Sequence, residues 1–221
     1  MINRILSIFF PNRCPYCGEL LSYPETEGDS CRSQLYPQPM LFTVLSGNLC
    51  AAAFIYEDPF RQAVLDMKFK GIKFNCESLG KVLTAACSEL VTEFRPEIIT
   101  SVPMSRDRLA IRGYNQSELL AKVAARELSL PYIRLLDRKN GARIQHELTM
   151  EQRLANHDLR FFLKEKEAIR GKTILLIDDI VTSGMTISEC CRILEDGGAE
   201  KVICACIAAA GDHKAASLHK Q

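Results

Sequence analysis

The sequence has almost no excess of either charge and no hydrophobic run long enough to cross a membrane. Its 28 Lys and Arg residues nearly balance 27 Asp and Glu residues, which leaves a formal net charge of +1 at pH 7. A nearly neutral chain has no general attraction to nucleic acid or to anionic membranes, so any site for a polyanion must be local. Nowhere do about 18 apolar residues follow one another, which excludes a membrane-spanning helix on length.

An export signal is also missing from the N-terminal stretch. Residues 1–11 contain one basic residue and a short apolar run that ends at Pro11, and no small-residue cleavage site precedes Cys14. This stretch predicts a packed helix rather than a signal peptide, and the protein is expected to be cytoplasmic. Its ten cysteines are therefore expected to be reduced, and several are expected to act as small buried hydrophobes. These are Cys76, Cys87, Cys190, Cys204 and Cys206.

The chain divides by composition into three parts, and it contains no internal repeat. Residues 1–48 include a proline-rich stretch with polar turns and little periodicity, which predicts a loop-rich N-terminal module. Residues 49–210 alternate apolar strands with amphipathic helices. Residues 211–221 are expected to be a frayed tail. A 221-residue chain can thus hold one α/β domain and a small accessory module.

The alternation in 49–210 is typical of a parallel sheet covered by helices on both faces. We expect strands at 50–57, 97–103, 131–138, 172–178 and 201–210, and helices at 58–71, 76–94, 117–128 and 187–198. The stretch 104–116 is too polar for a core and is interpreted as a basic loop. The charged stretch 139–159 is expected to be mobile.

Two adjacent carboxylates, Asp178 and Asp179, follow the apolar run "ILLI". In an open parallel sheet, ligands collect at the carboxyl ends of the strands, where this pair is predicted to lie. Two buried charges without partners would be costly. The alternative is that the pair only ends the strand in solvent.

The residues that follow the acid pair favour a ligand. Thr182, Ser183, Gly184, Met185 and Thr186 precede a predicted helix, so their backbone N–H groups and the helix N-terminus suit an anion. Gly184 permits close approach of the anion, and the hydroxyls add donors. The loop is neither GxGxxG nor GxxxxGK[ST], which disfavours dinucleotides and nucleoside triphosphates. A loop-bound monophosphate with a sugar diol on two carboxylates describes a ribose 5-phosphate.

The stretch "ILLIDDIVTSGMT" resembles the phosphoribosyl pyrophosphate (PRPP) motif of type I phosphoribosyltransferases. The resemblance implies their fold. It also implies that Asp178 and Asp179 hold the ribose diol and support the transition state, while residues 182–186 hold the 5-phosphate. The pyrophosphate leaving group needs cations, for which Arg106, Arg108 and Arg112 are the candidates. A solvated basic loop is the alternative for these arginines. A Mg²⁺ ion is expected on the pyrophosphate.

Three further stretches resemble the ComF (competence protein F) family, a branch of the phosphoribosyltransferase superfamily. They are "VPMSRDRLAIRGYNQSELLA", "RIQHELTMEQRLANHDLRF" and "FPNRCPYCG". The resemblance implies a part in natural transformation, with incoming single-stranded DNA and other competence proteins as partners. The acceptor of any phosphoribosyl transfer is left open.

A small metal site is predicted in the N-terminal module. Cys14 and Cys17 form a CxxC knuckle, for which structural Zn²⁺ is the usual reason. The family pattern pairs it with a second CxxC, of which only Cys31 is present; Gly28 stands at the other position. Cys50 is the candidate fourth ligand, although a buried strand cysteine is an equal interpretation. A metal-free module is the alternative.

Two function classes therefore stay open. The first is a Mg²⁺-dependent phosphoribosyltransferase that uses PRPP. The second is a non-catalytic module that binds single-stranded DNA or partner proteins, for which the basic stretches "KFKGIK" and "RDRLAIR" lie near aromatic residues. A transcription regulator that senses PRPP is a weaker third class, because no helix-turn-helix is recognisable.

Overall fold

A computed structural model describes residues 12–22, 24–32, 39–58, 60–70, 74–138 and 161–210. Three expectations fall outside these residues: the N-terminal helix over 1–11, the character of 139–159, and the tail 211–221.

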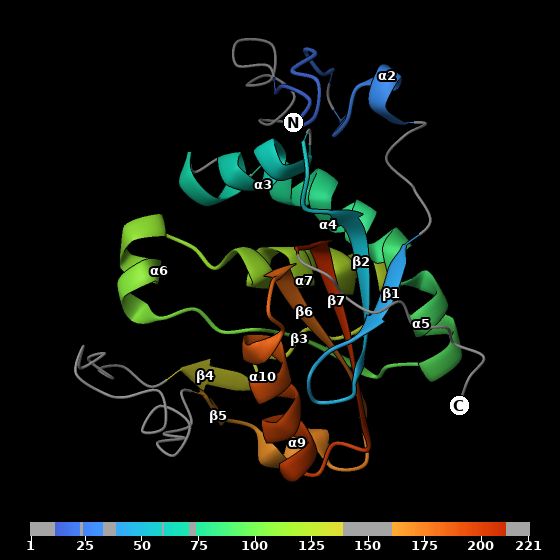
Figure 1. Cartoon of the computed structure of the whole chain (residues 1–221), viewed down its shortest axis with the longest axis vertical. Helices are drawn as coiled ribbons and strands as arrows, with labels where there is room; N and C mark the ends of the chain where they lie inside the picture. The colour runs from blue at the N-terminus through green and yellow to red at the C-terminus, as the bar shows by residue number, and fades with distance from the viewer. Residues whose placement is uncertain are drawn as a thin grey trace.

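A five-stranded sheet in the order β1-β2-β7-β6-β3 forms the centre of the molecule (Figure 1). Neighbouring strands from β2 to β3 are parallel, and β1 joins the edge antiparallel to β2. The expected parallel α/β fold is confirmed. The strands are β1 (Met40–Thr43), β2 (Leu49–Ile55), β3 (Ile98–Ser101), β6 (Thr173–Val181) and β7 (Lys201–Ala209).

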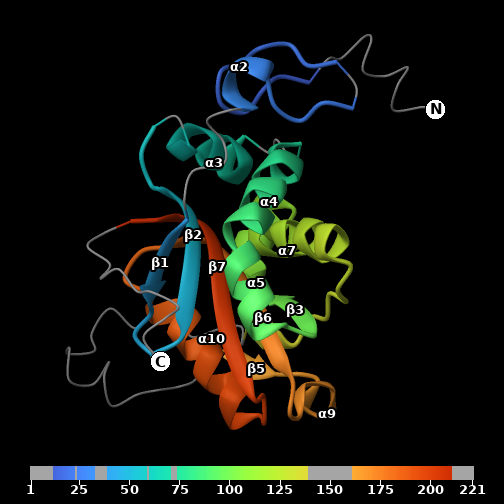
Figure 2. The same ribbon diagram turned by 90° about the vertical axis from the view of Figure 1, so that its right-hand side faces the viewer.

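Helices and a small second sheet cover the two faces of this central sheet, as Figure 2 shows. Alternate β6 residues point to opposite cores: Leu175 and Ile177 pack with α4 and α7, whereas Ile174 and Leu176 pack with α10. Burial on both faces explains why β6 and β7 are apolar almost throughout. The covering elements are α3 (Phe60–Phe69), α4 (Asn75–Ala86), α5 (Ser88–Phe94), α7 (Gln116–Leu128), α9 (Lys166–Ile169) and α10 (Met185–Asp196), with β4 (Leu136–Arg138) paired to β5 (Phe161–Leu163).

Three predicted elements differ from the structure. The strand expected over 131–138 is only β4, which pairs antiparallel with β5 outside the central sheet. The single helix expected over 76–94 is two helices, because Cys87, at φ −92° and ψ 6°, leaves helical geometry between α4 and α5. The basic loop contains the helix α6 (Arg106–Arg112), which Ser105 caps and Gly113 ends. Since α6 buries no residue, it has no apolar stripe by which its sequence could reveal it.

The main sheet begins earlier than the boundary predicted at residue 49, because β1 lies within the stretch assigned to the N-terminal module. The remaining described part of that stretch, residues 12–22 and 24–32, contains the short helix α2 (Asp29–Arg32) and lies above α3 and α4 in Figure 1. It packs there through Tyr16, whose hydroxyl is 3.0 Å from the Ser78 hydroxyl and whose ring meets Phe60 edge-on. We call residues 12–32 the cysteine module.

Within the described ranges, no helix combines the length and the apolar character that crossing a membrane requires.

Candidate functional site

An open cleft of about 370 Å³ lies at the carboxyl ends of the central strands. It collects side chains from segments that are far apart in the sequence, including the end of β6, the loop before α10, and α6. Its lining comprises Tyr56, Lys68, Val102, Pro103, Met104, Arg108, Arg112, Asn115, Ser117, Arg138 and residues 178–187. The cleft therefore brings together all the predicted PRPP residues except Arg106.

The acid pair lies inside β6 rather than beyond its end. Pairing with β7 continues past the aspartates to Val181, so both carboxylates are held by a strand in the middle of the sheet. The buried Asp178 accepts hydrogen bonds from the Ser117 hydroxyl and the Asp179 N–H, both at 2.8 Å. Its orientation is thus fixed by α7 and by its own backbone.

The pKa of Asp178 is raised to about 7. Burial is the main cause, because removal from water disfavours the charged form, and the neighbouring charge of Asp179 acts in the same direction. The Ser117 hydrogen bond opposes the shift. Asp178 therefore changes charge near neutral pH, where small changes in its surroundings determine its protonation.

Asp179 has a cationic partner that the sequence did not reveal. Lys68, near the end of α3, places Nζ 2.9 Å from Asp179 Oδ2, and both side chains are about 15% exposed. The Ile180 N–H donates to the other carboxylate oxygen at 2.6 Å. Lys68 belongs to the stretch "KFKGIK", which sequence reasoning assigned to a possible DNA surface; only the packing of α3 against the sheet brings it to Asp179.

The phosphate-loop candidate, residues 182–186, forms the turn between β6 and α10. Gly184 has φ +73° and stands directly before the first residue of α10, in the left-handed region that glycine adopts without strain. A Cβ there would meet Val44 and Leu45 at 3.9 Å, so space alone does not demand glycine. Thr182, Ser183 and Thr186 are exposed toward the cleft. The turn thus offers hydroxyls and a helix N-terminus to an anion.

The three arginine candidates separate in the structure. Arg108 and Arg112 line the cleft, whereas Arg106 is exposed on the first turn of α6 outside its lining. Arg112 is steadied by the Phe69 ring, whose centroid is 5.1 Å from its guanidinium carbon, and it donates to Gln116 Oε1 at 3.3 Å. Another arginine, Arg138, the last residue of β4, also lines the cleft. The sequence pattern around it predicted only a strand and did not indicate a function.

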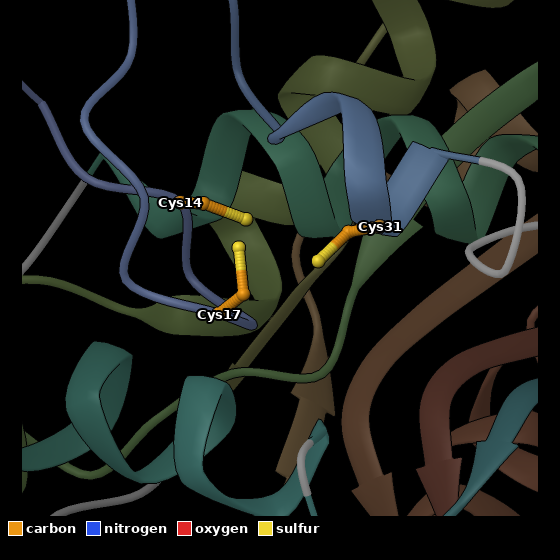
Figure 3. A group of neighbouring side chains, drawn as sticks. All are labelled: Cys14, Cys17 and Cys31. Atoms are coloured by element: carbon orange, nitrogen blue, oxygen red, sulfur yellow. The ribbon is translucent and has the colours of Figure 1, made fainter.

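The thiols of Cys14, Cys17 and Cys31 form the second candidate site (Figure 3). Their sulfur atoms lie within 4.8 Å of one another, and the figure shows all three pointing into one space between the knuckle and α2. A tetrahedral Zn²⁺ site has sulfur atoms about 3.8 Å apart, so this group fits such an ion with little movement. Cys50 is not part of it: it is fully buried in β2, opposite Cys204 of β7, as a packed core residue.

The environments of these thiols differ. Hydrogen bonding from the Glu19 backbone lowers the pKa of Cys17, whereas burial raises the pKa of Cys31 to about 12. Cys17 is therefore the thiol that ionises more easily, and Cys31 the one that keeps its proton. A bound metal ion would remove this difference, because metal binding deprotonates every thiol ligand.

Comparison with protein families gives a match to the phosphoribosyl transferase domain over residues 114–220. The chain is also 37% identical over 144 residues to Competence protein ComFC of Streptococcus pneumoniae. The aligned region is 65% of this chain and 62% of that protein. Competence protein F of Haemophilus influenzae is 26% identical over 85% of this chain and 82% of its own length. The DNA utilization protein YhgH of Escherichia coli is 26% identical over 88% and 82%.

The predicted resemblance to the ComF family is confirmed. The part of the chain that matches the domain contains the acid pair and the loop 182–186. The α6 arginines and the cysteine module lie outside residues 114–220, so their assignment depends on the geometry described above.

Likenesses to solved structures are weak. A crystal structure of adenine phosphoribosyltransferase covers 81% of this chain and 89% of its own chain, with a TM-score of 0.42 and 14% identity. Purine phosphoribosyltransferase from Pyrococcus horikoshii covers 60% and 74%, with a TM-score of 0.39 and 17% identity. Likenesses at this level carry no argument.

Proposed function

We propose that the cleft binds PRPP together with Mg²⁺ as the donor for a phosphoribosyl transfer. The observation that carries the proposal is the convergence, in one cleft of about 370 Å³, of an acid pair, a hydroxyl-lined helix N-terminus and cationic side chains. PRPP carries a diol, a monophosphate and a pyrophosphate in one small molecule. Each of these groups has a chemically matched partner in the cleft.

The residue roles follow from this matching. Asp178 and Asp179 accept hydrogen bonds from the ribose hydroxyls, and residues 182–186 hold the 5-phosphate. Arg108 and Arg112 contact the pyrophosphate, for which planar guanidinium groups are well suited. Negative charge beside the ring also stabilises the oxocarbenium character that develops when pyrophosphate leaves C1. Lys68 fits this scheme because its ammonium group pairs with the Asp179 carboxylate and holds it in place.

Mg²⁺ fits the same site by its ligand preference. The carboxylates of Asp178 and Asp179 and the oxygens of pyrophosphate are hard oxygen ligands of the kind that Mg²⁺ selects. When bound, the ion would neutralise charge on the leaving group. The chain's own contribution is to fix the two carboxylates and to aim the arginines from α6.

Isothermal titration of PRPP in the presence of MgCl₂ tests the donor site. The variant Asp178→Asn together with Asp179→Asn removes both charges with little change of shape, and we expect its PRPP affinity to fall at least about a hundredfold. Glu97→Gln, which removes an exposed carboxylate on the edge of β3, is the matched control and should bind as the wild type does. Unchanged affinity in the folded double variant would reject the proposal.

A second candidate function, binding of single-stranded DNA, is supported by a neighbouring surface. An open cleft of about 490 Å³ is lined by Lys68, Phe69, Lys70, Arg108, Ile111 and Arg112. Phe69 is 69% exposed and Ile111 85% exposed, so apolar groups for stacking stand among cations that can follow a phosphate backbone. The relatives named for competence and DNA utilization accord with this chemistry.

Fluorescence anisotropy with an oligo-dT probe at 50 and 200 mM salt tests this second function. DNA binding through this surface predicts a steep salt dependence and at least about a fivefold loss in Phe69→Ala. Lys164→Ala, an exposed lysine at the end of β5, is the control for net charge. A flat salt response, or equal losses in both variants, would count against the surface.

We also propose that the three thiols of the cysteine module bind structural Zn²⁺. The mutual distances of their sulfur atoms support this assignment. The ion would join the CxxC knuckle to α2, two segments that have only a small core of their own. Reduced thiols accord with the cytoplasmic location expected from the sequence.

A further inference from the structure

The three thiols leave one position of a tetrahedral metal site to another ligand. Among the described residues, Glu19, two positions after Cys17, places its carboxylate beside one of the three thiols. Cys17 Sγ lies 3.9 Å from Glu19 Oε2, and the Ser30 hydroxyl donates to the same oxygen at 3.5 Å. The carboxylate of Glu19 therefore lies between the Cys17 thiol and Ser30 of α2.

Gly28 explains why this space is open to a carboxylate. A Cβ added at position 28 would lie 2.3 Å from Glu19 Oε2 and 3.3 Å from Cys17 Sγ. The carboxylate thus occupies the volume that a side chain at position 28 would take, beside the same sulfur atom. A cysteine at 28 and the carboxylate of Glu19 exclude each other unless one of them moves.

The distance to Cys17 and the charge suit coordination. The carboxylate lies outside the group of three ligand atoms that are within 4.8 Å of one another, so it would turn toward Cys14 and Cys31 when the ion binds. A thiolate sulfur at 2.3 Å and a carboxylate oxygen at about 2.1 Å from Zn²⁺ are about 3.6 Å apart in a tetrahedral site, close to the observed 3.9 Å. The backbone of Glu19 is already fixed in the knuckle, because the Cys14 N–H donates to its carbonyl at 2.8 Å. A carboxylate also gives the site the same formal charge as a fourth thiolate, which a neutral water or the Ser30 hydroxyl would not.

We propose that Glu19 supplies the fourth ligand and that the cysteine module holds a three-thiolate, one-carboxylate metal site in which Gly28 leaves room for the carboxylate. This inference rests on the metal site proposed above for Cys14, Cys17 and Cys31. It assigns to Glu19 a role that nothing in the local sequence pattern indicates.

Metal affinity of the full chain, measured by Zn²⁺ competition with a chromogenic chelator, tests the assignment. We expect Glu19→Gln to bind Zn²⁺ at least about tenfold more weakly than the wild type. Glu25→Gln changes another exposed glutamate of the module, whose carboxylate accepts a hydrogen bond from the Ser22 N–H, and should leave the affinity unchanged. Equal affinities of these two variants would overturn the role of Glu19.

Adding Gly28→Cys to Glu19→Ala sharpens the test. Ala empties the space that the carboxylate fills, which the isosteric Gln would not, so the new thiol can enter it. The double variant should regain the affinity that Glu19→Ala loses, and its Co²⁺ form should show the stronger thiolate-to-metal absorption of four sulfur ligands. Failure to regain affinity would contradict the exclusive use of one space by the two side chains.

Cys17→Ser separates this inference from the metal site itself. If Cys17→Ser retains wild-type metal affinity, the thiol site proposed above is wrong and the inference falls with it. If Cys17→Ser loses the metal while Glu19→Gln does not, the thiol site stands and only the assignment of Glu19 is rejected.

Discussion

The cleft and the cysteine module obtain their geometry in different ways. The acid pair of the cleft extends a strand whose preceding residues, Ile174 to Ile177, are all fully buried between two cores. In the described part of the cysteine module, the buried hydrophobic residues are only Cys14 and Leu21. The cleft is therefore shaped by the fold before any ligand arrives, whereas the module needs an additional link.

This difference follows from size. A small segment cannot bury enough apolar surface to offset the entropy of ordering its chain, so short modules rely on metals or disulfides. A parallel sheet covered on both faces has no such need. We expect the two regions to respond oppositely to the loss of their ligands.

Removal of the metal should produce the largest effect, a loss of order that is confined to the cysteine module. A structural Zn²⁺ site contributes on the order of 10 kcal/mol to the order of its surroundings, so a strong chelator should expose residues 12–32 to proteases. Cleavage mapped by mass spectrometry measures this. Cys17→Ser should already be cleaved without the chelator, and PRPP affinity should persist in both samples. Equal protection with and without the chelator would contradict the comparison.

In the cleft, by contrast, the buried Asp178 carboxylate is expected to lower the free energy of unfolding, and Asp178→Asn tests this. Since the pKa of Asp178 is about 7 in the folded chain and about 3.9 when unfolded, the folded state holds the proton more tightly. The resulting stabilisation is full below about pH 4 and is lost as pH rises to 7, by about 4 kcal/mol at most. Asn cannot lose a proton, so this variant should be the more stable form at pH 8.

Urea unfolding at pH 5 and pH 8 measures this effect as the difference between Asp178→Asn and the wild type. At pH 5 the variant should be more stable than the wild type by only about 1.5 kcal/mol, because the unfolded carboxyl is already ionised there, and at pH 8 the difference should grow to about 4 kcal/mol. The same difference at both pH values would show that Asp178 does not titrate between them.

Much of the fold could be predicted because its strands and long helices carry strong patterns. The runs around β6 and β7 are apolar on both faces, and α7 and α10 carry clear apolar stripes. What escaped prediction is either very short or buries no side chain. The helix α6 buries nothing, and β1 has only four residues. Periodicity records burial, so elements without burial leave no trace in it.

The candidate site divides along the same principle. Asp178, Asp179 and the loop 182–186 are contiguous, so one motif predicted their meeting in the cleft. Lys68 and Ser117 come from α3 and α7, and only the packing of those helices on the sheet brings them to the acid pair. Glu19 is a third case, because its place beside Cys17 depends on the absence of a side chain at Gly28.

Lys68→Met should destabilise the chain by an intermediate amount. It leaves the carboxylate of Asp179 largely buried beside Asp178 without its cation, and breaking such a pair costs about 2 to 3 kcal/mol when some solvent still reaches it. Lys172→Met, which breaks an exposed ion pair with Glu97, is the control and should change unfolding in urea little. Equal effects of the two variants would show that the fold does not enclose the acid pair as described.

The smallest expected effect distinguishes two arginines on one helix. Arg112 lines the cleft and Arg106 does not, so Arg112→Ala should weaken pyrophosphate binding about tenfold, as expected for one lost charge-assisted contact. Arg106→Ala removes the same charge from the same helix and should leave the affinity within about twofold. Titration with pyrophosphate and, separately, with ribose 5-phosphate measures both, because only the pyrophosphate arm should respond to Arg112. A larger loss in Arg106→Ala would mean that α6 turns toward the cleft when the ligand binds, and that the cleft, like the cysteine module, is completed by what it holds.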